Sequence, residues 1–106
     1  MTTRTYTTTH LWLQPDPVSG RLWVGITERG DEAMGGIVYL DVDEGANTIT
    51  VEGRKSVLEV VPPVRGKIDE TNTPDWSPTV PVVCYEPGWE MTERTMTQEE
   101  YDDYED

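Results

Sequence analysis

Short apolar runs alternate with polar residues along most of the chain, and turn-forming residues separate one run from the next. Gly, Pro, Asn and Asp gather in these breaks, as is typical of tight turns between strands. The pattern predicts a mostly β domain of short strands. The expected strands are residues 9–13, 21–26, 37–42, 48–52, 56–60, 64–68, 82–86 and a last one near 89–92, with an irregular stretch at 69–81.

One short helix is expected after the second strand, in the sequence TERGDEAMGG at residues 27–36. Thr27 is a suitable N-cap, and acidic residues follow it in the first turns. Gly35 and Gly36 end the pattern, since glycine readily adopts the left-handed conformation found after helix C-termini.

Residues 96–106 form an acidic C-terminal helix or tail that differs in character from the β domain expected over residues 1–95. Thr97 begins a capping-box pattern, and Tyr101 and Tyr104 would share one helix face. An isolated helix this short is marginal, so it needs docking against the β domain to persist. A frayed acidic tail is the alternative.

The charge of the chain limits its partners. It has 106 residues, of which 21 are acidic and 8 are basic, so its net charge is −13. Nucleic acid phosphates and anionic membrane surfaces would repel it, and neither is an expected partner. A basic protein partner fits this charge, although acidity also serves solubility alone.

Candidate catalytic and metal-binding residues are scarce. The chain has one cysteine, Cys84, and one histidine, His10. They permit neither an internal disulfide nor a clustered metal site, and no nucleophile–base pair is apparent, so we assign no catalytic residue. We expect Cys84 to be a buried apolar residue and His10 to make structural hydrogen bonds. A lone cysteine and the lack of an apolar signal segment indicate a cytoplasmic protein.

One lysine, Lys55, falls on the expected turn between the strands at 48–52 and 56–60. An amine at such an apex is solvated, which makes it a poor nucleophile but leaves it accessible to a modifying enzyme. Gly53 permits a positive φ in this turn. An ordinary surface lysine is the simpler alternative.

The segment VEGRKSVLEVVPPVRGKI, residues 51–68, resembles the modification loop of the glycine cleavage system H protein, a small lipoyl carrier. Four further segments resemble the family and follow its order along the chain: YTTTHLWL, VGITERG, MGGIVYLDVD and SPTVPVVCYEPGW. This collinearity makes the resemblance specific. The residues of the loop that match are Val51, Glu52, Lys55, Val60, Pro63, Val64 and Gly66.

The resemblance implies a lipoyl-type barrel-sandwich hybrid of two small antiparallel sheets, with a short helix after the second strand and a short C-terminal helix. It implies lipoate attached to Lys55 by a lipoyl-attaching enzyme that recognises Glu52, Gly53 and Arg54. A non-catalytic carrier of this kind would serve glycine decarboxylase, aminomethyltransferase and dihydrolipoamide dehydrogenase.

Four positions correspond to the family's cleft for the loaded arm: Thr9, Leu11, Arg29 and Glu59. Leu11 replaces a family Glu and Arg29 replaces a family His, whereas Thr9 and Glu59 are conservative replacements of Ser and Asp. An ammonium leaving water needs carboxylate partners. Both larger changes weaken cation binding, so we expect weak support of glycine cleavage.

Two alternatives to this carrier role remain open. The chain could keep the fold as an unmodified structural or interaction protein with an assembly partner, such as a viral assembly component. It could also carry a lipoyl arm for another pathway.

Overall fold

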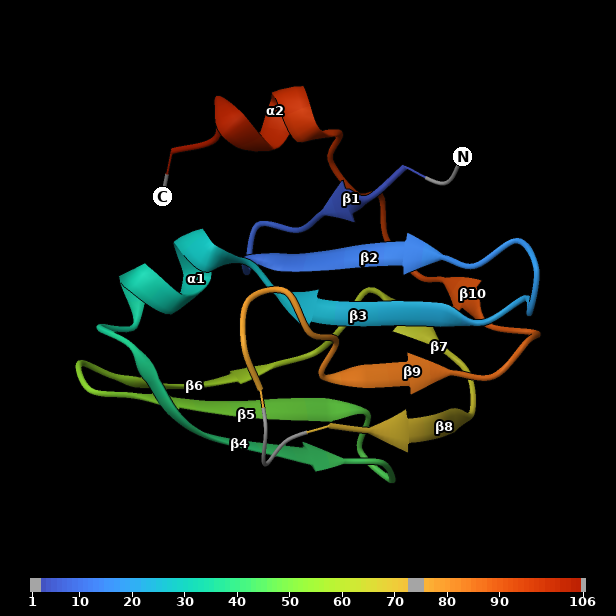
Figure 1. The fold of residues 1–106 in the computed structure, drawn as a ribbon, viewed down its shortest axis with the longest axis horizontal. Helices are drawn as coiled ribbons and strands as arrows, with labels where there is room; N and C mark the ends of the chain where they lie inside the picture. Colours follow the sequence, from blue (N-terminus) through green and yellow to red (C-terminus); the bar gives the residue numbers. More distant parts are fainter. Residues whose placement is uncertain (1–2, 73–75, 106) are drawn as a thin grey trace.

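The computed structural model describes residues 3–72 and 76–105, which form three antiparallel sheets (Figure 1). The largest sheet has the order β1-β2-β3-β9-β8. Its strands are β1 (Thr5–Tyr6), β2 (Leu11–Pro15), β3 (Leu22–Ile26), β9 (Val83–Tyr85) and β8 (Ile68–Thr71). The second sheet has the order β4-β5-β6, with β4 (Ile37–Asp43), β5 (Thr48–Gly53) and β6 (Val57–Val60). The third sheet pairs β7 (Val64–Arg65) with β10 (Glu90–Met91).

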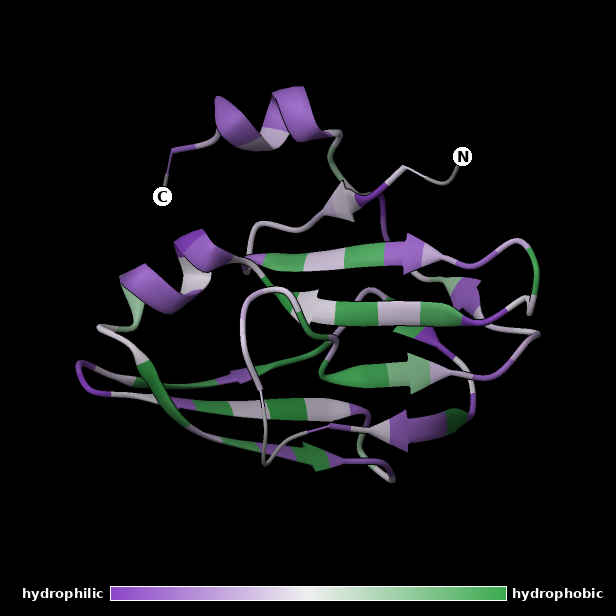
Figure 2. Ribbon diagram, viewed as in Figure 1, coloured by the Kyte–Doolittle hydropathy of each residue, from purple (hydrophilic) through white to green (hydrophobic). Residues whose placement is uncertain are grey.

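The main core lies between the two larger sheets, which both contribute apolar residues to it (Figure 2). Such burial is the main favourable contribution to the stability of a small domain. Its buried residues are Leu11, Leu13, Leu22, Val24, Ile26, Met34, Leu40, Ile49, Val51, Val60, Val64, Val82, Val83 and Tyr85.

The predicted mostly β class is confirmed, and so are the two short helices. Helix α1 (Glu28–Ala33) has Thr27 as its N-cap, and the Thr27 side chain accepts a hydrogen bond from the backbone N–H of Gly30. Helix α2 (Gln98–Asp102) begins with the predicted capping box of Thr97 and Glu100. Among the described residues, no helix is long and apolar enough to span a membrane.

Several strand boundaries differ from the prediction. Strand β2 begins at Leu11 because the preceding residues form a turn, in which the N–H of His10 donates to the carbonyl of Thr7 at 3.1 Å and His10 has a φ of 65°. The expected strand at 64–68 is divided between β7 and β8. Strand β8 extends to Thr71, into the stretch expected to be irregular, while residues 73–75 of that stretch lie outside the described residues.

Strand β2 buries both of its faces, which explains its unbroken apolar run. Leu11 and Leu13 belong to the main core, whereas Trp12 joins a second cluster with Tyr6 and Tyr101. The Trp12 indole lies directly over Gly25 of β3, where an added Cβ would overlap the indole ring. A glycine is therefore required opposite Trp12 for reasons of space.

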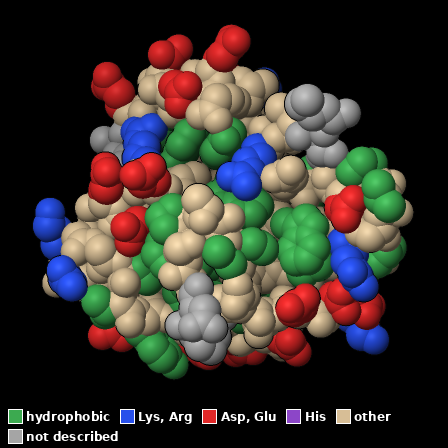
Figure 3. Space-filling model, viewed as in Figure 1, with side chains coloured by type: hydrophobic (Ala, Val, Ile, Leu, Met, Phe, Trp, Pro, Cys, Tyr) green, Lys and Arg blue, Asp and Glu red, His purple; other side chains and the backbone are tan. Residues whose placement is uncertain are grey.

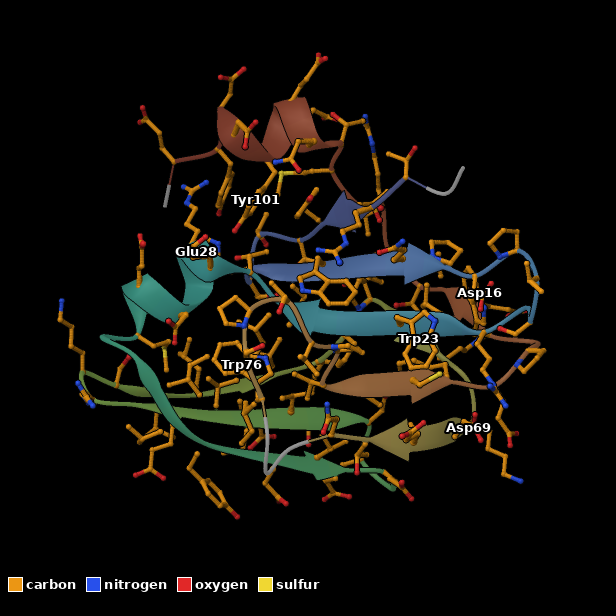
Figure 4. All side chains as sticks on the ribbon, viewed as in Figure 1. Asp16, Trp23, Glu28, Asp69, Trp76 and Tyr101 are labelled. Carbon is orange, nitrogen blue, oxygen red and sulfur yellow. The ribbon has the colours of Figure 1, made fainter. Side chains whose placement is uncertain are left out.

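Helix α2 packs over this second cluster. The Tyr101 ring stacks on the Tyr6 ring with their centroids 4.7 Å apart, and its hydroxyl lies 2.7 Å from Thr27 Oγ1 and 2.8 Å from His10 Nδ1. Figure 4 shows Tyr101 extending from α2 toward the sheet. Because Tyr101 is only 4% exposed, α2 is docked, and the alternative of a frayed tail does not apply to this helix.

Arg29 of α1 holds the far end of α2. Its Nη1 donates to the carbonyl of Tyr101 at 2.9 Å, and its Nη2 donates to the carbonyl of Tyr104. Helix α2 has no basic residue in its own last turn. Arg29 therefore supplies the positive charge that favours a helix C-terminus.

Replacing Gly25 with alanine should lower the free energy of unfolding by about 1–3 kcal/mol, because the new methyl group displaces the Trp12 indole. Urea denaturation measures this change. The control is Gly45→Ala in the exposed turn after β4, where the nearest atom to an added Cβ is 3.5 Å away and little change is expected. Equal losses in the two variants would contradict the packing argument.

Replacing Arg29 with alanine should release α2, because two carbonyls at its C-terminal end lose a charged donor, each such bond contributing about 1.5–3 kcal/mol. Hydrogen exchange at the Tyr101 amide, which donates to the carbonyl of Thr97, should accelerate. Arg54→Ala removes the same charge from the exposed hairpin and should leave this exchange rate unchanged. Unaltered protection in Arg29→Ala would show that α2 is held by its aromatic contacts alone.

Candidate functional site: the Lys55 hairpin

Lys55 lies at the apex of the hairpin that joins β5 to β6, at one end of the molecule (Figure 1). The N–H of Gly53 donates to the carbonyl of Ser56 at 2.9 Å and closes the turn. Arg54 and Lys55 are both exposed, and Figure 3 shows basic side chains projecting from this end. The structure therefore presents the Lys55 amine to solvent, as the sequence predicted.

The loop that follows α1 supports this apex from behind. The carbonyl of Met34 accepts a hydrogen bond from the N–H of Lys55 at 3.0 Å, and the carbonyl of Gly36 accepts one from Arg54 at 3.1 Å. A Cβ on Gly53 would overlap the Met34 carbonyl, and a Cβ on Gly35 would lie 2.6 Å from Lys55 Cγ. Because residue 53 is a glycine, the hairpin backbone can approach the Met34 carbonyl this closely. Because residue 35 is a glycine, the stem of the Lys55 side chain can lie against it.

Glu52, three residues before the lysine, lies on the outer face of the three-stranded sheet. It is paired with Tyr39 of β4 and Val57 of β6, and all three side chains are exposed. Side chains of directly paired residues point to the same face of a sheet. Glu52 and Arg54 are thus accessible to an enzyme that approaches the hairpin, whereas Gly53 is partly buried in the support.

A small cavity adjoins the inner face of the hairpin, and we call it the Leu11 cavity. Its volume is about 50 Å³. It lies between the start of β2, helix α1 and strands β5 and β6. The residues that line it are Thr9, His10, Leu11, Ile26, Gly30, Ala33, Met34, Val51, Leu58 and Val60.

Of the four cleft candidates, the structure places Thr9 and Leu11 in the lining of this cavity and the other two elsewhere. Arg29 is directed to α2 by its bonds to the carbonyls of Tyr101, in the helix, and Tyr104, just after it. Glu59 is exposed and pairs with Thr50, so it shares the outer face with Glu52. The structure therefore does not bring these four side chains together.

Three contacts of Tyr101 were missed at the level of sequence. The helical spacing indicated that Tyr101 would dock, but nothing in the pattern identified His10, Thr27 or Arg29 as its partners. Those partners are 72 to 91 residues away in the chain. His10 does have the structural hydrogen-bonding role that was predicted.

Cys84 is 1% exposed, as predicted, and burial raises the pKa of its thiol to about 11. A thiol that stays protonated near neutral pH is a weak nucleophile. Among the described residues, no group of three or more His, Cys, Asp or Glu side chains is placed to bind a metal. The Lys55 hairpin itself offers an exposed amine.

The comparisons with known proteins agree with this geometry. The family model described as glycine cleavage H-protein matches residues 4–104. The chain is 33% identical over 103 residues to the glycine cleavage system H protein of Micrococcus luteus, covering 89% of this chain and 80% of that protein.

Other relatives share shorter or weaker matches. Identity to the H protein of Paraburkholderia phytofirmans is 37% over 75 residues, which span 64% of this chain and 59% of that relative. The crystal structure of a glycine cleavage system H protein from Mycobacterium marinum superposes with a TM-score of 0.73 at 28% identity, covering 92% of each chain. This chain belongs to the glycine cleavage H-protein family.

Proposed function

We propose that the protein is a lipoyl carrier with its arm attached to Nζ of Lys55. The observation that carries this proposal is the Lys55 hairpin, which exposes an amine on a turn whose backbone N–H groups donate two hydrogen bonds to carbonyls of the loop after α1. The H-protein family consists of non-catalytic lipoyl carriers, and the position of Lys55 corresponds to the family's modified lysine.

The residues around Lys55 fit such an attachment. The lysine stem lies in the space left by Gly35, which fixes the direction in which an attached arm starts. Attachment joins the lipoate carboxyl carbon to Nζ by an amide bond, while the activating group on the carboxyl leaves and Nζ gives up a proton. The dithiolane would supply the redox and group-carrying chemistry when present, and the protein supplies position.

The proposed partners follow from family membership and from charge. They are a lipoyl-attaching enzyme that reads Glu52, Gly53 and Arg54, and the glycine decarboxylase, aminomethyltransferase and dihydrolipoamide dehydrogenase of the glycine cleavage system. The net charge of −13 favours partners with basic docking surfaces. We place this exchange in the cytoplasm, with residues 1–95 as the carrier domain and residues 96–106 as its acidic C-terminal helix or tail.

Expression with a lipoate ligase and lipoate should add the mass of one lipoyl group to the protein, and Lys55→Arg should abolish this addition. Intact mass spectrometry measures both. Lys67→Arg is the matched control, since Lys67 is the other lysine of the chain and its side chain is also exposed. Loss of the added mass in Lys67→Arg, or its persistence in Lys55→Arg, would contradict the assignment.

The support from Gly35 can be tested separately. Gly35 and Gly36 have φ values of 74° and 95°, so alanine strains the backbone at both positions. Only at Gly35 would the methyl group also displace Lys55, because nothing lies within 4 Å of an added Cβ on Gly36. We expect the initial rate of lipoylation to fall about tenfold in Gly35→Ala and much less in Gly36→Ala. Equal rates in the two variants would show that the packing of the lysine stem does not matter to the ligase.

A further inference from the structure

Helix α1 connects the C-terminal helix α2 to the Lys55 hairpin, and it lies between them in Figure 1. At the start of α1, the side-chain oxygen of the N-cap Thr27 lies 2.7 Å from the hydroxyl of Tyr101 in α2. At the end of α1, the carbonyl of the C-cap Met34 accepts the hydrogen bond from the N–H of Lys55. A continuous set of hydrogen bonds therefore links Tyr101 to the backbone of the lysine.

The Tyr101 hydroxyl joins the N-cap of α1 to the turn before β2. It contacts Thr27 Oγ1 and also lies 2.8 Å from His10 Nδ1, while the N–H of Thr27 donates to the carbonyl of His10 at 2.9 Å. Thr27 Oγ1 accepts from the N–H of Gly30 as well, and Thr27 is only 7% exposed. The oxygen atom that caps α1 is thus held in place by a residue of α2.

Arg29 makes a second link between the two helices. It lies in the first turn of α1, and its Nη1 donates to the main-chain carbonyl of Tyr101 at 2.9 Å. Its guanidinium carbon is 5.1 Å from the centre of the Tyr101 ring. Helix α1 has only 6 residues, and a helix this short depends on docking to persist. Tyr101 therefore restrains α1 at two residues of its N-terminal end.

The C-terminal end of α1 fixes the loop that holds the hairpin. The N–H of Gly35 donates to the carbonyl of Glu32 at 3.0 Å, and the N–H of Gly36 donates to the carbonyl of Asp31 at 2.9 Å. Both acceptors belong to α1. The carbonyls of Met34 and Gly36, which accept from the hairpin, consequently move with the helix.

We propose that Tyr101 is a positioning residue for the arm on Lys55 and that it acts through α1. Docked α2 holds the N-cap of α1, and α1 in turn holds the loop whose two carbonyls orient the hairpin. The role in arm positioning rests on the proposed lipoyl attachment. Because α2 is short and lies at the chain terminus, its local opening is the step that would loosen the hairpin apex.

The alternative is that Tyr101 only covers the second aromatic cluster, and one atom separates the two roles. Tyr101→Phe removes the hydroxyl but keeps the ring that stacks on Tyr6. Tyr104→Phe is the matched control, because it makes the same change just after α2. Tyr104 is half-buried, and its hydroxyl has no hydrogen-bond partner among the described residues.

Hydrogen exchange measured by NMR reports the state of the hairpin support. The amide hydrogens of Lys55 and Arg54 donate to the loop after α1, so both should exchange faster when α1 is less restrained. We expect acceleration of about fivefold in Tyr101→Phe, the factor that corresponds to one ordinary hydrogen bond. Tyr104→Phe should leave both rates unchanged. Unchanged rates in Tyr101→Phe would overturn the inference.

Two other amides distinguish this coupling from a general loss of stability. The N–H of Gly53 donates to the carbonyl of Ser56 within the hairpin, and the N–H of Val82 donates to the carbonyl of Val24 in the core. Neither bond involves α1 or its loop, so both amides should exchange at the same rate in the two variants. Equal acceleration at Gly53, Val82 and Lys55 in Tyr101→Phe would also overturn the inference.

Variants of Thr27 test the route of the coupling. Thr27→Val removes the capping hydroxyl at nearly constant size and should accelerate exchange at Lys55, whereas Thr27→Ser keeps a hydroxyl and should restore most of the protection. In Thr27→Val, adding Tyr101→Phe should have little further effect, because the bond between the two residues is already absent. Fully additive effects would show that the route does not include the N-cap and would reject it.

The initial rate of lipoylation by a lipoate ligase connects the coupling to function. We expect it to fall about threefold in Tyr101→Phe and to stay unchanged in Tyr104→Phe, since a less ordered hairpin presents its amine less often in the reactive geometry. If Lys55 is never lipoylated, the carrier proposal fails, and the role in arm positioning fails with it. If both variants are lipoylated equally fast, the carrier proposal stands and the positioning role of Tyr101 is rejected.

Discussion

The close approach of two backbone segments, the hairpin apex at 53–55 and the loop at 34–36, determines the geometry around Lys55. Each segment donates or accepts through main-chain atoms, and glycine at positions 35 and 53 removes the side chains that would hold them apart. Main-chain contacts are less mobile than contacts between long side chains. The amine is thus presented on a rigid support although its own side chain is exposed.

Leu11 and Arg29, the two larger departures expected from the family pattern, lie in different parts of the structure. Leu11 contributes an apolar side chain to the lining of the cavity, whereas Arg29 donates to the carbonyls of Tyr101 in α2 and Tyr104 just after it. None of the described residues that line the cavity is an acid, and Arg29 anchors the C-terminal helix.

Much of this fold follows from local pattern. The hairpin at Lys55, the N-cap at Thr27 and the capping box at Thr97 are set by neighbouring residues, and the sequence predicted all three. Strand β1, which pairs with β2, has only two residues, too few to show a periodicity, and it was not predicted. The positions of Arg29 and Glu59 also escaped prediction, because strand register and the docking of α2 decide which way those side chains point.

The burial of Cys84 in β9 has a consequence for any dithiol that the protein carries. A reduced arm and an accessible cysteine on one chain would be at high effective concentration, and oxidation would join them in a mixed disulfide. Cys84 is the one cysteine of the chain, it is 1% exposed, and the pKa of its thiol is raised. A dithiol arm on this chain would therefore find no accessible thiol on its own scaffold, and thiol exchange would take place with partner molecules.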